Sequence, residues 1–146
     1  MLEMRILIAE VLMFIYSISD IKTHKIDIRF IVIAWIMIFF TGNEFCITAL
    51  IPGCILIAIA LVFPLHIGLG DGILFAFFGM ICRLEGVISI LLISFFMTAV
   101  YAAFIMIRHN ISGMSEDKNA TIPLVPFIFA SFNIVLLLGY DRGLFI

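Results

Sequence analysis

Long apolar runs, separated by short polar connectors, divide the chain into six segments. A helix that crosses the hydrocarbon core of a bilayer needs about 20 largely apolar residues, so runs of this kind predict transmembrane helices. The predicted segments cover about residues 4–19, 28–41, 46–66, 71–82, 87–107 and 123–140. Pro52 and Pro64 predict kinks near the ends of the third segment, and residues 83–86 predict a tight polar turn. We therefore expect an all-α polytopic membrane protein with a single domain, residues 1–146.

The composition favours the same fold class and excludes a water-soluble globule. Of the 146 residues, 65% are hydrophobic and 12% are charged, and the mean hydropathy is +1.33. Polar side chains are thus too few to coat a soluble surface. No basic tract indicates nucleic-acid binding. Cys46, Cys54 and Cys82 lack the paired spacing of a zinc site or a disulfide framework, so we expect small buried side chains, with no metal and no cofactor.

The distribution of Lys and Arg predicts the orientation in the membrane. Nothing near the end of the first segment resembles a cleavage site, so we expect a retained anchor and six spans with both termini on one face. The connectors after the first and fifth spans carry five basic residues, Lys22, Lys25, Arg29, Arg108 and Lys118, and the opposite face carries three, Arg5, Arg83 and Arg142. The basic connectors are expected in the cytoplasm, which gives an N-out, C-out topology. Asp20 and Asp71 then lie at the same cytoplasmic edge.

One carboxylate stands between glycines in the stretch Gly68-Leu69-Gly70-Asp71-Gly72. An ionisable residue at membrane depth is energetically costly and is therefore a candidate functional residue. Glycines without a Cβ atom allow unusual dihedral angles, and they let a substrate backbone or a neighbouring helix come close to the carboxylate. The stretch therefore predicts an active-site backbone around Asp71.

Asp20 supplies a second carboxylate at the same predicted depth. Two carboxylates a few Å apart cannot both ionise, so one holds a proton while the other acts as a base toward water. Each residue alone also has a structural interpretation: Asp20 as a solvated helix terminus, and Asp71 as a helix N-cap. The helix ends favour a proton on Asp20 and a basic Asp71, because the macrodipole disfavours a carboxylate at a C-terminus and favours one at an N-terminus. Lys22 and Lys25 oppose that assignment.

Three stretches resemble the type IV prepilin peptidases, a family of membrane-embedded aspartyl proteases with a G-x-G-D motif. Residues 19–26, Ser-Asp-Ile-Lys-Thr-His-Lys-Ile, are similar to the family's first motif, an Asp followed by a basic cluster and an Ile. Residues 68–71, Gly-Leu-Gly-Asp, match the second, and residues 122–127, Ile-Pro-Leu-Val-Pro-Phe, are similar to the Ile-Pro-Phe-x-Pro-Phe stretch that opens the family's last span. The resemblance implies that Asp20 and Asp71 are the catalytic pair. The supporting residues in these motifs are Lys22, His24, Lys25, Pro123 and Pro126.

The chain departs from this family pattern at two positions and lacks one module. Asp27-Ile28 replaces the usual Pro-Asn, and Ile73 replaces a common Lys two residues after the catalytic Asp. These departures bear on local geometry and on the choice of substrate. The paired Cys-x-x-Cys motifs of the bifunctional members, associated with N-methylation, do not occur in this sequence. We therefore expect peptidase activity alone.

The resemblance implies removal of a short basic leader from prepilin-like precursors, such as type IV pilins, pseudopilins or archaellin-like proteins, at the inner face of a prokaryotic plasma membrane. Two alternatives remain open at this point. The presenilin-like intramembrane proteases share a G-x-G-D motif, but the basic cluster directly after Asp20 favours cleavage at the membrane edge. A small proton- or ion-coupled transporter subunit would use the same carboxylates as relay groups, yet few other polar residues line the spans.

Overall fold

The computed structural model describes residues 2–23, 28–41, 46–63, 68–112, 123–139 and 144–145, and these residues form an all-α structure. The elements in chain order are α1 (Leu2–Thr23), α2 (Ile28–Thr41), the 3-10 helix η1 (Ile47–Leu50), α3 (Ile51–Val62), α4 (Leu69–Phe78), α5 (Leu84–Ser112) and α6 (Val125–Gly139). The described residues contain no β-strand, only an isolated bridge between Cys82 and Phe145. Each of the six predicted segments contains one α-helix, which confirms the all-α prediction.

Two details of the predicted helix ends are wrong. Pro52 lies in the first turn of α3 and so starts that helix instead of kinking it, because the first turn needs no donor from proline. Pro64 lies outside the described residues. The predicted polar turn at residues 83–86 is mostly the first turn of α5, which begins at Leu84 and includes Glu85. A carboxylate is favourable there because the first turn presents free N–H groups.

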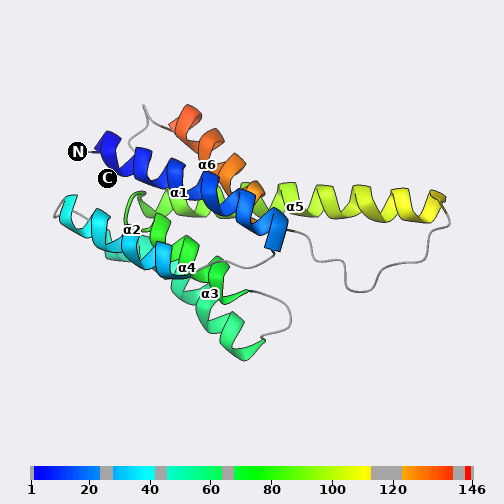
Figure 1. Ribbon diagram of the computed structural model, residues 1–146, viewed down its shortest axis with the longest axis horizontal. Helices are drawn as coiled ribbons and strands as arrows, with labels where there is room; N and C mark the ends of the chain where they lie inside the picture. Colours follow the sequence, from blue (N-terminus) through cyan, green and yellow to red (C-terminus); the bar gives the residue numbers. More distant parts are fainter. Residues whose placement is uncertain are drawn as a thin grey trace.

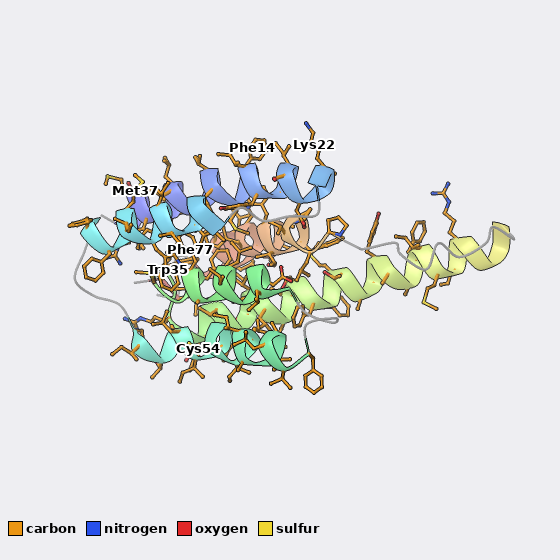
Figure 2. The ribbon with its side chains drawn as sticks, turned by 60° about the horizontal axis from the view of Figure 1, so that its bottom comes forward. Phe14, Lys22, Trp35, Met37, Cys54 and Phe77 are labelled. Carbon is orange, nitrogen blue, oxygen red and sulfur yellow. The ribbon has the colours of Figure 1, made fainter. Side chains whose placement is uncertain are left out.

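The helices form three layers in Figure 2: α1 and α2 on one side, α3 and α5 on the other, and α4 and α6 between them. Packing follows this order, since α1 contacts α2 and α6, α4 contacts α2 and α3, and α5 contacts α6. Figure 1 shows the start of α1, the end of α6 and the start of α5 at one end of the bundle. The end of α1 and the start of α6 therefore meet at the other end.

Helix α4 is the centre of the bundle. Its residues Phe75, Phe77 and Phe78 are all fully buried, and Figure 2 shows Phe77 between the outer layers. Phe78 packs on Phe132 of α6, with ring centroids 5.1 Å apart. Aromatic pairs at this distance add to the stabilisation that comes from burial alone. These contacts hold the second half of α4, the helix whose first turn carries Asp71.

The outside of the bundle is apolar. Among the described residues, exposed large hydrophobic side chains outnumber the buried hydrophobic ones, which is the reverse of what water favours. Within the described part of the chain, one helix is both long enough and apolar enough to cross a membrane, the Leu84–Arg108 part of α5, and only 11% of its most apolar part is buried. The apolar helices Ile47–Val62, Leu69–Phe78 and Val125–Leu138 are shorter. Both views show α5 projecting well beyond the other helices.

Candidate functional site

Asp20 is a buried carboxylate in the last turn of α1. Its residue is only 7% exposed, so the interpretation as a solvated helix terminus is wrong. The backbone N–H of Val125, the first residue of α6, donates a hydrogen bond to Asp20 Oδ2 with an N···O distance of 3.0 Å. A buried carboxylate needs such a donor, because its desolvation is otherwise uncompensated. The contact joins the first and third predicted motifs.

The two prolines of the third motif explain why Val125 is the donor. Pro123 and Pro126 have no backbone N–H. The N–H groups of Phe127 and Ile128 both donate to the carbonyl of Leu124, at 3.0 and 3.1 Å. The Val125 amide therefore lies between prolines at the helix start, where an amide has no partner within its own helix. It is free to bond a group from elsewhere, and that group is Asp20.

Asp71 is the third residue of α4, and its carboxylate turns back toward the start of its own helix. Gly68, not Asp71, is the N-cap of α4, so the interpretation of Asp71 as the cap is wrong. The Asp71 N–H donates to the Gly68 carbonyl at 3.1 Å, and the Gly68 backbone hydrogen-bonds to the Asp71 carboxylate. This is the second half of a capping box, with Asp in place of Glu or Gln, and the Gly68 carbonyl replaces the N-cap side chain as acceptor. It fixes the direction of the side chain.

Asp20 and Asp71 come from separate helices, and they lie within range of each other's charge. The charge of Asp20 acts directly on Asp71, and the Asp71 residue is half-buried. A buried carboxylate next to a more accessible one is an arrangement in which the two groups share protons, because two adjacent negative charges repel strongly where water is scarce. The two carboxyl groups are thus close enough for the charge of one to affect the other.

The three glycines of the second motif have different roles. Gly68 has φ −74° and ψ 134°, which any residue adopts, so an unusual dihedral angle is not the reason for glycine there. A Cβ on Gly68 would lie 3.1 Å from Asp71 Oδ2, so glycine leaves room beside the carboxylate. Gly72 faces Ile57 of α3 and lets the two helices approach closely. Gly70 lies half-buried in the first turn of α4.

The remaining predicted site residues lie around this pair or outside the described part of the chain. Lys22 is exposed at the end of α1, and Figure 2 shows it pointing away from the bundle. Pro123 and Pro126 are half-buried at the start of α6. His24 and Lys25 lie outside the described residues. The structure thus places Pro123 and Pro126 near Asp20 through the Val125 contact, and it turns Lys22 outward.

Only one cysteine has the predicted environment. Cys82 is fully buried, Cys46 is half-buried, and Cys54 is exposed on the outside of α3. The prediction of three buried side chains is therefore wrong for Cys54. An apolar outer surface places a small hydrophobic side chain on the exterior without penalty when the surroundings are lipid.

The Val125 backbone amide is the group that sequence reasoning missed. A backbone donor carries no residue-type signal, but the Pro-x-x-Pro spacing does: it removes two donors from one helix start and leaves amides between them. Comparisons with protein-family models, with curated proteins and with solved structures give no match to this chain.

Proposed function

We propose that this chain is a membrane-embedded aspartyl endopeptidase that removes the short basic leader of prepilin-like precursors. The single observation that carries the proposal is the electrostatic interaction between Asp20 and Asp71, with the start of α6 bonded to Asp20. These elements are the three stretches that resemble the prepilin peptidases. The apolar exterior and the Leu84–Arg108 span support a membrane location. Six spans with both termini outside, in a prokaryotic plasma membrane, are part of the proposal.

The proposed chemistry needs one charged and one protonated carboxyl group. The charged carboxylate takes a proton from water while the water oxygen attacks the carbonyl carbon of the scissile peptide bond. The protonated carboxyl group gives its proton to the carbonyl oxygen, which forms a tetrahedral diol. The carboxyl group that took the proton from water then passes it to the leaving amine nitrogen as the C–N bond breaks. The other carboxylate takes a proton from a diol hydroxyl, which becomes the carbonyl oxygen of the product, so both groups return to their starting states. No covalent intermediate with the enzyme is formed.

Substrate binding follows from the position of the pair at one end of the bundle. Lys22 lies two residues beyond Asp20 and is exposed, which places water at this end of α1, since an ammonium group strongly favours hydration. A precursor with an apolar helix in the bilayer and a leader in the cytoplasm would present the connecting peptide bond at this depth. The arrangement favours cleavage beside a substrate helix over cleavage within it.

The test is cleavage of a purified prepilin by the full chain in detergent, followed by gel shift and mass spectrometry of the new N-terminus. We expect leader removal by the wild-type chain and none by Asp20→Asn or Asp71→Asn. Glu85→Gln is the matched control, because Glu85 is an exposed carboxylate in the first turn of α5, at the other end of the bundle. Full cleavage by both Asn variants would overturn the proposal. So would an absence of cleavage combined with a proton or ion flux in liposomes, which would favour a transporter.

A further inference from the structure

We infer that the start of α6 is the positioning element of the carboxylate pair: the Val125 amide holds the Asp20 carboxylate in place and keeps it charged, so that Asp20 is the base and Asp71 carries the shared proton. The inference rests on the proposed peptidase function. The dipoles of α1 and α4 alone favour the opposite assignment, a proton on Asp20 and a charged Asp71. The start of a third helix, α6, reverses it.

The hydrogen bond to Asp20 comes from the interior of the bundle. Val125 is fully buried and Asp20 is 7% exposed, so little water competes for their 3.0 Å contact. A hydrogen bond to a charged acceptor is roughly twice as strong as one between neutral groups, and low surrounding polarity strengthens it further. Helix α6 has 15 residues, and its macrodipole directs partial positive charge at the same oxygen. Both effects strengthen the contact between the start of α6 and the Asp20 carboxylate.

Asp71 also has a backbone partner, but a weaker one. Its partner Gly68 is exposed at the helix start, where water competes for the bond. Gly68 also belongs to the same turn as Asp71, whereas Val125 ties Asp20 to a different helix, 105 positions away. The contact from α6 therefore sets the position of Asp20 relative to the rest of the site. The contact from Gly68 orients Asp71 within its own helix only.

The charged side chains around Asp20 do not by themselves determine which aspartate is charged, so the contact with α6 decides it. Helix α4 brings Asp71, whose charge repels that of Asp20. The described part of α6 contains no charged residue. On α1 itself Lys22 is exposed and points outward, and the side chain of Arg29 at the start of α2 lies outside the described residues.

The test removes one backbone N–H and keeps every side chain. Replacing Val125 by its α-hydroxy acid, through stop-codon suppression in the full chain, puts an ester oxygen where the N–H was. The matched control is the same replacement at Leu124, whose amide does not contact Asp20. The measurement is the infrared carbonyl band of a protonated carboxyl group during a pH titration. It is made in an Asp71→Asn background, with the Asp20→Asn/Asp71→Asn double variant subtracted, so that only Asp20 is observed.

We expect the ester at Val125 to raise the pH midpoint of Asp20 protonation by about one to two units, the range for a lost hydrogen bond to a charged group. The ester at Leu124 should leave the midpoint unchanged. Equal midpoints for the two esters would overturn the inference. If the ester-containing chain does not fold, Val125→Pro serves instead, since a helix tolerates proline at its first position. Its control is Val125→Ala, which keeps the amide, and equal midpoints for these two would likewise overturn the inference.

The readout also separates the inference from the proposed function, because it needs no substrate. A chain that cleaves prepilin but shows no difference between the two esters keeps the function and loses the inference. A chain that cuts nothing but shows the shift keeps the Val125 contact and loses the function. In the cleavage assay with both aspartates present, the Val125 ester should move the acidic limb of the activity profile to higher pH. A purely structural role for Val125 would lower activity equally at every pH.

Discussion

Gly72 of α4 lies so close to Ile57 of α3 that a Cβ on Gly72 would stand 2.8 Å from the Ile57 backbone nitrogen. The contact holds the first turn of α4 against its neighbour, one residue after Asp71. Gly72→Ala should therefore push α4 away and displace the carboxylate. We expect a stability loss of about 1–3 kcal/mol from overpacking together with a loss of peptidase activity. Thermal unfolding in detergent and the cleavage assay measure the two effects.

The control for this prediction is Leu69→Ala. Leu69 lies in the same turn but is exposed, so its truncation should change neither the unfolding temperature nor the activity by much. Equal behaviour of Gly72→Ala and wild type would show that the two helices are not in this contact in the protein.

Gly68→Ala tests the site with little effect on the fold. Gly68 has ordinary backbone angles, so alanine fits the backbone, but its Cβ would lie 3.1 Å from Asp71 Oδ2. The carboxylate must then shift by a few tenths of an ångström. Displacements of about 1 Å at a reacting group cost on the order of 100-fold in rate, so we expect a loss of up to about tenfold in kcat. Unfolding temperature should stay at the wild-type value, and a fall in stability without a fall in kcat would contradict the prediction.

The two carboxylates should act as one unit in mutant kinetics. General acid–base catalysis contributes about 10²- to 10⁴-fold, and groups that act on one water molecule give strongly non-additive losses. The Asp20→Asn/Asp71→Asn double variant should therefore be no slower than the slower single variant. Single-turnover cleavage with excess enzyme measures this. Losses that multiply in the double variant would indicate two independent roles.

Phe132 should contribute strongly to stability. Its ring is fully buried and packs on Phe78 of α4 and Phe145. Phe132→Ala leaves a cavity in the centre of the bundle and should cost about 3–5 kcal/mol. Phe96→Ala is the control, because Phe96 is 71% exposed on α5. Denaturant unfolding in micelles compares them, and an equal loss for both would contradict the packing described for α4 and α6.

The all-α class was predictable, because long apolar runs between polar connectors are typical of helices. Each predicted segment holds a helix, but the ends shifted: α1 continues to Thr23 and α5 begins at Leu84. Polar residues at helix ends obey capping and dipole effects that hydropathy does not contain. Residues 83–86 show this, since Arg and Glu suggested a turn where Glu85 suits a helix start.

The sequence motifs predicted candidate site residues but not their contacts. The two aspartates came from motif positions, and helix counting predicted that they lie at the same end of the helices. The burial of Asp20 and its bond to Val125 did not follow, because both depend on where α6 packs. The glycines were expected to let a neighbouring helix come close, and Gly72 does so. That this neighbour is α3 did not follow, because helix–helix spacing depends on two segments and the second motif lies in only one of them.

Helix α5 extends past the rest of the bundle, and this has a consequence for the bilayer in which we propose that the chain lies. The ring of Tyr101 contacts that of Phe127 near the start of α6, yet α5 continues with exposed apolar side chains such as Phe104 and Ile107 to Arg108. At 1.5 Å per residue, the part from 101 to 108 is about 10 Å long. The ammonium group of Lys22 favours water, whereas the exposed apolar side chains of α5 at the same depth favour hydrocarbon. The bilayer leaflet should therefore be locally thinner over the two carboxylates than along α5. Such thinning would let water reach the scissile peptide bond while the outer faces of the helices stay in contact with lipid.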